Sequence, residues 1–179
     1  MIANLLNTLT LSRILCAILI YLFLYLESYY LLALIFFAVA SFSDFLDGYL
    51  ARKTDSISVL GEILDPIADK LLIVFVLIGL SINLDSFLIG FISAVIISRE
   101  IWVAALRDIN ARNNQSDKTK VTFLAKTKTA IQMLAILMYL FGLTLNNMMV
   151  LFFADIVLII ALLVTIQTGF QYTVSTFKK

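Results

Sequence analysis

The stretch "SDFLDGYLARKTDSISVLGEILDPIADK", residues 43–70, carries five aspartates and one glutamate between flanks that are almost purely apolar. Over the whole chain of 179 residues, 62% are hydrophobic and 14% are charged, and the mean hydropathy is +1.04. A soluble domain is nearer half apolar and a quarter charged. The excess lies in long unbroken runs, so we predict an all-α membrane protein.

Outward from this stretch, the apolar runs predict six transmembrane helices. Their approximate bounds are 9–26, 31–51, 62–82, 86–106, 123–145 and 149–171. Residues 1–8 are compatible with a separate short helix lying in the membrane interface. The first run lacks a small-residue cleavage site, so we expect it to remain as a span. No repeat or linker interrupts the pattern, and we expect one domain over 1–179.

The basic residues predict how the helices are oriented. All 13 lysines and arginines fall in the N-terminus, the loops at 52–61 and 107–122, the C-terminal tail, or the adjoining ends of the spans. The opposite side shows Glu27 and Asp85 and no basic residue. By the positive-inside rule, both termini face the cytoplasm. The net charge of +1 gives no indication of a nucleic-acid partner, and we expect none.

Four aspartates of the acidic stretch form two pairs. Asp44 and Asp47 are three residues apart, and Asp65 and Asp69 are four apart, so each pair shares one helical face. Both pairs lie about 12 Å from the intervening loop, at matching depth on antiparallel helices. Four carboxylates within spans would cost on the order of 10 kcal/mol, which a water-filled cavity or a bound cation must offset.

The residue types available favour a hard cation at these carboxylates. The chain has no histidine, and its one cysteine, Cys16, lies inside an apolar run. Oxygen ligands without His or Cys suit Mg²⁺, Mn²⁺ or Ca²⁺. A cation transporter would also explain buried carboxylates and is the alternative from a different class. Asp55 and Glu62, beside the loop, are interpreted as helix-capping or surface groups.

The spacing of the stretch is D-x2-D-G-x2-A-R-x8-G-x3-D-x3-D. Its fixed positions are Asp44, Asp47, Gly48, Ala51, Arg52, Gly61, Asp65 and Asp69. This spacing resembles the signature of the CDP-alcohol phosphotransferase family. The resemblance implies six transmembrane helices, a homodimer, a site for two divalent metals (Mg²⁺ or Mn²⁺), and displacement of CMP from a CDP-linked lipid or alcohol.

The same resemblance implies a role for each position of the motif. Asp44, Asp47 and Asp65 would bind metal, and Asp69 would complete the metal site and act as the catalytic base. The cytidine pocket would be lined by Gly48, Ala51 and Gly61, with Arg52 at the pyrophosphate. The composition agrees with the base, because a chain without histidine must pass the alcohol's proton to a carboxylate.

A second group of residues is cationic. Arg99 lies within the fourth predicted span, eight residues before Arg107, and so about 12 Å deep. A buried arginine needs an anion, and the neighbouring Glu100, about 100° away around the helix, is predicted to be a poor sole partner. With Lys126 and Lys128 at the start of the fifth span, these cations indicate a pocket for a second phosphate. The alternatives are an ion pair of Arg99 with an aspartate and anchoring of the lysines at the membrane surface.

Further blocks extend the resemblance over most of the chain. "NTLTLSRI", "ISREIWVAALR" and "AKTKTAIQM" resemble bacterial family members that join CDP-diacylglycerol to sn-glycerol 3-phosphate. This implies phosphatidylglycerophosphate and CMP as products, at the cytoplasmic side of a bacterial inner membrane. Sister activities that make cardiolipin, phosphatidylinositol phosphate or phosphatidylserine stay open as alternatives, although a cationic pocket argues against serine.

Overall fold

The computed structural model describes residues 2–54, 59–119 and 123–178, except for the side chains of 2–7, 44–54, 59–63, 116, 123 and 126. This part of the chain is all-α, as predicted, with six α-helices and a short 3₁₀ helix, η1, between the fourth and fifth. The bounds are α1 Ile2–Tyr25, α2 Tyr30–Thr54, α3 Val59–Asn83, α4 Phe87–Arg112, η1 Ser116–Thr119, α5 Phe123–Leu145 and α6 Met148–Phe177.

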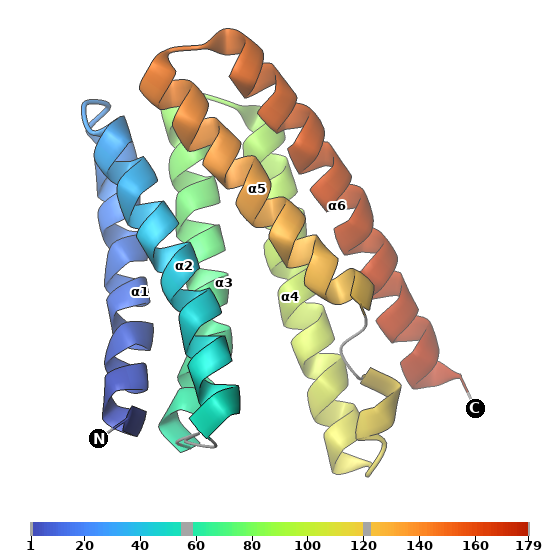
Figure 1. Cartoon of the computed structure of the whole chain (residues 1–179). Helices are drawn as coiled ribbons and strands as arrows, with labels where there is room; N and C mark the ends of the chain where they lie inside the picture. The colour runs from blue at the N-terminus through green and yellow to red at the C-terminus, as the bar shows by residue number, and fades with distance from the viewer. Residues whose placement is uncertain (1, 55–58, 120–122, 179) are drawn as a thin grey trace.

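The helices run alternately up and down, so both termini lie at one end of the molecule (Figure 1). The same end holds the last residues of α2, the first residues of α3 and the segment η1, so the described basic residues lie toward this end. At the opposite end the connections are tight, and each contains a residue with positive φ: Glu27, Asp85 and Asn146. Asn147 then caps α6 by accepting hydrogen bonds from the amides of Met149 and Val150.

Several helices extend further at the basic end than their apolar runs predicted. α1 begins at Ile2, so the prediction of a separate short helix over residues 1–8 is wrong: residues 2–8 form the first turns of α1. α4 continues to Arg112 and α6 to Phe177. Hydropathy marks where a helix leaves an apolar medium, whereas backbone hydrogen bonding continues through the polar residues beyond that point.

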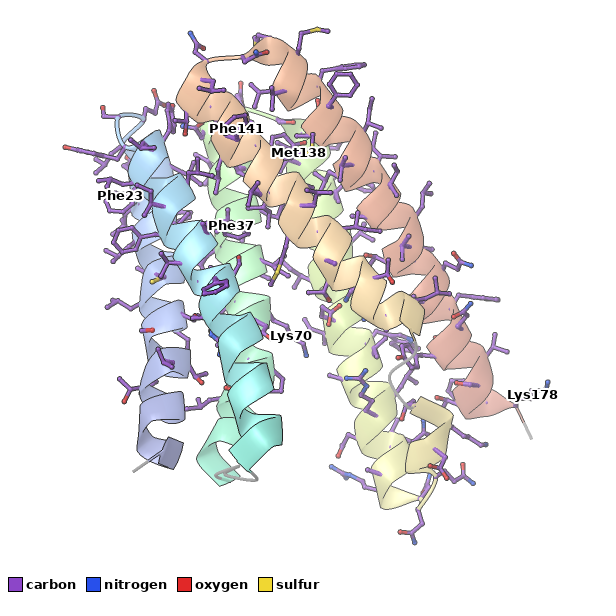
Figure 2. All side chains as sticks on the ribbon, viewed as in Figure 1. Phe23, Phe37, Lys70, Met138, Phe141 and Lys178 are labelled. Atoms are coloured by element: carbon purple, nitrogen blue, oxygen red, sulfur yellow. The ribbon has the colours of Figure 1, made fainter. Side chains whose placement is uncertain are left out.

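The packing order brings α1 against both α2 and α3, while α6 packs against α4 and α5. α3 contacts α4, and α2 contacts α5, which joins the two groups. One continuous core fills the molecule away from the basic end, with Ala17, Ile20, Leu72, Val76 and Leu140 among its fully buried members. Phe37 of α2 and Met138 of α5, labelled in Figure 2, belong to or pack against this core.

Large apolar side chains also cover the outside of the helices. Phe87 is 86% exposed and Phe170 is 69% exposed. Within the described residues, four helical segments are long and apolar enough to cross a membrane, namely Thr8–Tyr25, Phe87–Arg112, Thr127–Leu145 and Met148–Phe177. Helices that are apolar on all sides but buried on one side only are typical of membrane proteins.

Candidate functional site

The acidic stretch lies where α2 ends and α3 begins, at the basic end of the molecule (Figure 1). Within the described residues, α2 carries Asp44 and Asp47, and α3 carries Asp65 and Asp69. Six positions of the motif fall outside the described side chains, so their predicted contacts stay predictions: Asp44, Asp47, Gly48, Ala51, Arg52 and Gly61. The geometry of the site therefore starts from Asp65 and Asp69.

Two side chains of α1 hold these aspartates. Thr10 Oγ1 donates a hydrogen bond to Asp65 Oδ1 at 2.6 Å. Arg13 Nη1 donates to Asp69 Oδ1 at 2.5 Å, and Arg13 Nη2 lies 3.8 Å from Asp65 Oδ1. Arg13 is 1% exposed, so its charge is withdrawn from water and is balanced by these carboxylates. α1 thus fixes one oxygen of each aspartate.

The sequence interpretation missed Thr10 and Arg13. It counted Arg13 only among the basic residues that orient the helices and within the block "NTLTLSRI". The signal was present, because Arg13 is the sole charged residue among the first 26, and a buried arginine in an apolar helix needs an anion. The spacing of three between Thr10 and Arg13 places both on one helical face. The packing of α1 against α3 could not be predicted from the sequence.

The chemistry of these residues fits a divalent metal. The Asp65 and Asp69 side chains are 48% and 34% exposed, so oxygens remain accessible beside the α1 contacts. No third carboxylate or cysteine joins them among the side chains that the structure describes. The other two predicted ligands, Asp44 and Asp47, belong to the undescribed set. Carboxylate oxygens are the ligands that Mg²⁺ and Mn²⁺ prefer.

A cavity of about 320 Å³ lies between α3, α4 and α5 next to Asp69. Its polar lining residues are Asp69, Lys70, Glu100, Arg107, Lys128, Thr129 and Gln132, and Ile73, Val74, Ile96, Ile97 and Ile101 are among the apolar ones. Lys70 extends from α3 toward α4 (Figure 2). The structure therefore brings the predicted base into one cavity with two of the predicted phosphate-binding cations, Arg107 and Lys128.

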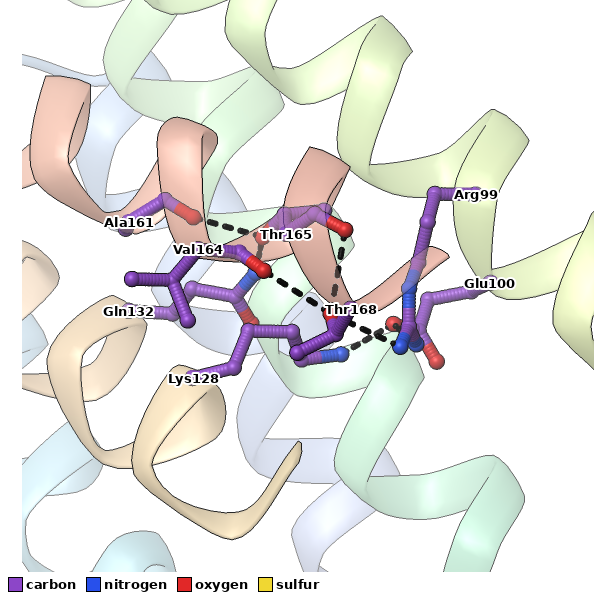
Figure 3. A network of polar contacts seen from close by, with 8 residues as sticks. All are labelled: Arg99, Glu100, Lys128, Gln132, Ala161, Val164, Thr165 and Thr168. Carbon is purple, nitrogen blue, oxygen red and sulfur yellow. Dashed lines mark hydrogen bonds and ion pairs between the residues drawn. The ribbon is translucent and has the colours of Figure 1, made fainter. Parts of the chain in front are cut away.

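Glu100 lies between two cations on the wall of this cavity (Figure 3). Arg99 Nη1 donates to Glu100 Oε1 at 2.9 Å, and Lys128 Nζ forms a short ion pair with the same oxygen. We predicted that Glu100 would be a poor sole partner of Arg99, and the structure shows that it is a direct ionic partner of Arg99, beside contacts with α6. The long side chain of Arg99 bends so that its guanidinium reaches Glu100. The angle of about 100° between adjacent residues around a helix does not predict this bend.

Arg99 is held on its other side by α6. Its Nη2 donates to Thr168 Oγ1 at 3.0 Å (Figure 3). The side-chain stem passes over Gly169, where an added Cβ would lie 3.1 Å from Arg99 Cγ. Arg99 does not line the cavity in the described structure. Its predicted contact with a second phosphate stays a prediction, and the ion pair seen here is with glutamate rather than with an aspartate.

A buried aromatic ring links the two arginines of α4. Tyr172 of α6 is 3% exposed, and its ring centroid lies 5.6 Å from Cζ of both Arg99 and Arg107. This distance allows a cation–π interaction with each guanidinium. The tyrosine thus helps to keep two cations near each other despite their repulsion. The remaining predicted cation, Lys126, belongs to α5, but its side chain is not described.

A polar contact beside the cavity joins α5 to α6. Gln132 lies one turn after Lys128 and donates to Thr165 Oγ1 at 3.1 Å (Figure 3). Thr165 in turn donates to the carbonyl oxygen of Ala161 at 2.6 Å. Gln132 and Thr165 are both buried. Buried side chains with satisfied hydrogen bonds have few alternative positions, so this contact holds the face of α5 that carries Lys128.

The arrangement suits one kind of chemistry. Lys70, Arg107 and Lys128 give the cavity three cations, enough to attract a phosphate group. Asp69 offers a carboxylate to accept a proton from a hydroxyl on the same molecule. The apolar wall formed by α3 and α4 would shield such a reaction from water.

Comparison with known proteins gives a consistent answer over nearly the whole chain. Residues 3–167 match the CDP-alcohol phosphatidyltransferase family. A Rickettsia bellii protein is 40% identical over 94% of this chain and 93% of its own length. A Rickettsia felis protein is 37% identical over 94% and 93%, and a Haemophilus influenzae protein is 38% identical over 82% and 77%. All three are named CDP-diacylglycerol–glycerol-3-phosphate 3-phosphatidyltransferase.

Proposed function

Because this chain belongs to the CDP-alcohol phosphatidyltransferase family, we propose that it is a CDP-diacylglycerol–glycerol-3-phosphate 3-phosphatidyltransferase. It transfers the phosphatidyl group of CDP-diacylglycerol to sn-glycerol 3-phosphate and yields phosphatidylglycerophosphate and CMP. The relatives with this name extend over almost the full length of the chain. The observation that carries the proposal is the cavity that joins Asp69 to Lys70, Arg107 and Lys128. A transferase family gives no support to the alternative of a cation transporter.

The four aspartates of the motif act on the pyrophosphate of CDP-diacylglycerol. Asp44, Asp47, Asp65 and Asp69 would hold divalent metal, Mg²⁺ or Mn²⁺, in a two-metal site. When bound, such a metal neutralises charge on the pyrophosphate as the phosphorus–oxygen bond changes partners. Thr10 and Arg13 orient Asp65 and Asp69 from α1.

The remaining motif positions receive the nucleotide. Gly48, Ala51 and Gly61 leave room for the cytidine, and Arg52 binds the pyrophosphate through its planar guanidinium. These assignments come from the family motif.

The chemical step needs one proton acceptor. The primary hydroxyl of glycerol 3-phosphate attacks the phosphorus that bears the diacylglycerol, and its oxygen forms the new phosphorus–oxygen bond. The bond from that phosphorus to the bridging oxygen of CMP breaks, and CMP leaves. Asp69 accepts the hydroxyl proton, because its carboxylate lines the cavity in which the hydroxyl would bind.

The acceptor phosphate binds on the opposite wall. Arg107 and Lys128 line the cavity and supply charge-assisted hydrogen bonds. Arg99 and Lys126 are the further candidates from the sequence. Arg99 also fixes Glu100 and is fixed by Thr168, so it would orient the cationic wall even without touching the phosphate.

We extend the proposal to the setting of the enzyme. The chain forms a single domain of six transmembrane helices, with α2 and α3 spanning the membrane as well as the four more apolar helices. Its termini and active site face the cytoplasm, because the basic residues share that end. We propose a bacterial inner membrane as its location, which the bacterial origin of its relatives supports, and a homodimer, which the family motif implies.

One assay tests the proposed function directly. The purified chain is given CDP-diacylglycerol and Mg²⁺, and CMP release is measured with glycerol 3-phosphate, serine, inositol 1-phosphate or phosphatidylglycerol as acceptor. We expect fast release with glycerol 3-phosphate and release near background with the others. Faster turnover with any other acceptor would replace this assignment by the corresponding sister activity.

A further inference from the structure

Glu100 is a carboxylate in a place where a phosphate is proposed to bind. It lines the cavity with Arg107 and Lys128, and its side chain is 19% exposed. A carboxylate near a bound phosphate is unfavourable, because the two negative charges repel each other. A residue at this position must therefore contribute something that offsets the repulsion.

The hydrogen bonds of Glu100 leave one of its oxygens available. Arg99 and Lys128 both contact Oε1. Among the described residues none donates a hydrogen bond to Oε2, and this atom is not among the buried ones without a partner. A carboxylate oxygen accepts about two hydrogen bonds. Oε2 is thus an accessible acceptor of a residue that lines the cavity.

The contacts at Oε1 fix where this free oxygen lies. Arg99 is itself held by Thr168 and Gly169 of α6, and Lys128 is 4% exposed on α5. Glu100 is therefore restrained from both neighbouring helices (Figure 3). A restrained acceptor selects its donor by position, which a mobile surface carboxylate cannot do.

We propose that Glu100 Oε2 accepts a hydrogen bond from the secondary hydroxyl of the acceptor and makes the enzyme specific for a phosphorylated vicinal diol. The inference rests on the proposed function and adds a specificity-determining residue to it. The acceptor then has three points of contact: its phosphate at Arg107 and Lys128, its reacting primary hydroxyl at Asp69, and its secondary hydroxyl at Glu100. The secondary hydroxyl forms and breaks no covalent bond.

This contact should be visible as discrimination between two acceptors. A single hydrogen bond to a charged group, once lost, lowers kcat/KM by roughly 10- to 100-fold. The informative pair is glycerol 3-phosphate and 3-hydroxypropyl phosphate, which lacks only the secondary hydroxyl. We define the specificity ratio as kcat/KM for the first divided by kcat/KM for the second.

The experiment measures this ratio by CMP release in the full-length wild type, Glu100→Ala, Glu100→Gln and Arg107→Gln. We expect a ratio of about 10–100 in the wild type and within about threefold of one in Glu100→Ala. Arg107→Gln is the matched control: it weakens phosphate binding for both acceptors and keeps the wild-type ratio. Loss of the Lys128 and Arg99 contacts in Glu100→Ala affects both acceptors alike, so it cancels in the ratio.

Two results would overturn the inference, namely a wild-type ratio near one or a wild-type ratio retained in Glu100→Ala. Should Glu100→Ala fail to fold, Glu100→Gln decides, since its neutral amide oxygen is a weaker acceptor. Its ratio should fall several-fold below the wild-type value, and an unchanged ratio would overturn the inference. Failure of the proposed function looks different: the wild type would release CMP faster with serine, inositol 1-phosphate or phosphatidylglycerol than with glycerol 3-phosphate, or would release none with any of them.

Discussion

The two walls of the cavity are built in opposite ways. On the α3 side, carboxylates at Asp65 and Asp69 are gathered around the buried guanidinium of Arg13. On the side of α4 and α5, the cations Arg99 and Lys128 are gathered around the carboxylate of Glu100. Each of these two clusters has one charge of the opposite sign at its centre, and α3 also contributes the cation Lys70 to the cavity.

The difference suggests a division of labour. A wall of carboxylates suits metal and proton transfer, and a wall of cations suits a phosphate. The central charge of each wall reduces repulsion among its neighbours while the wall keeps its overall sign. Changes on the aspartate wall should therefore act on chemistry, and changes on the cationic wall should act on the acceptor.

The largest effect is expected from Asp65→Asn. A neutral amide cannot balance a dication, so turnover should fall by roughly 1,000-fold or more and divalent-metal binding should weaken. Calorimetric Mg²⁺ titration and CMP release at limiting Mg²⁺ measure both. Asp108→Asn is the matched control, because Asp108 pairs with Arg112 at the surface and should tolerate the change. Near-normal activity of Asp65→Asn at limiting Mg²⁺ would remove this residue from the metal site.

Arg13→Gln tests whether α1 positions the aspartates. It removes the buried charge that holds both carboxylates, so kcat should fall by about 100-fold, as for other residues that support metal ligands. The free energy of unfolding should drop by about 2–3 kcal/mol, less than for a fully buried pair because the aspartates are partly exposed. Arg13→Lys should recover part of the activity. A variant with normal kcat but lowered stability would leave Arg13 a purely structural role.

Arg99→Ala tests the cationic wall. It releases Glu100 from one of its two partners and removes any direct phosphate contact. Acceptor use should fall by about 30-fold or more, and by less in Arg99→Lys, which keeps the charge but loses the planar fork. The apparent affinity for CDP-diacylglycerol should stay unchanged. The opposite pattern, a weakened nucleotide lipid and unchanged glycerol 3-phosphate, would assign Arg99 to the pyrophosphate.

The smallest effect is expected from Gly169→Ala. The new methyl group would lie 3.1 Å from Arg99 Cγ, so the arginine stem must shift by a few tenths of an ångström. We expect acceptor use to fall by about 3-fold, since overpacking moves side chains modestly. Gly142→Ala is the matched control, because its methyl group would lie 2.8 Å from Leu151 Cδ2, far from the cationic wall. Equal acceptor kinetics in wild type and Gly169→Ala would show that the position of Arg99 is not critical.

Much of the fold was predictable, because apolar runs determine where helices cross an apolar medium. The central parts of all six helices and the short connections at the end opposite the termini follow from the sequence. The basic-end extensions of α1, α4 and α6 do not, since polar residues continue a helix without an apolar signal. For the same reason, the sequence did not show that residues 2–8 are continuous with α1.

For the site, the sequence provided candidate residues but not the contacts between them. The motif spacing singled out Asp65 and Asp69, and the depth of Arg99 singled out the cationic wall. The contact of Arg13 with Asp69 depends on α1 packing against α3, which no periodicity encodes. The contact of Glu100 with Arg99 depends on the side-chain conformation of Arg99, which the backbone geometry does not determine.

The division between the two walls can be tested most directly by titrating each substrate separately in Asp69→Asn and Lys128→Met. We predict that Asp69→Asn lowers kcat by about 100- to 10,000-fold while CDP-diacylglycerol still binds. Lys128→Met should raise KM for glycerol 3-phosphate by about 30-fold and leave KM for CDP-diacylglycerol within a few-fold of wild type. If Asp69→Asn kept activity within about tenfold of wild type, or if Lys128→Met weakened the nucleotide lipid instead of the acceptor, the assignment of chemistry and acceptor binding to opposite walls would be contradicted.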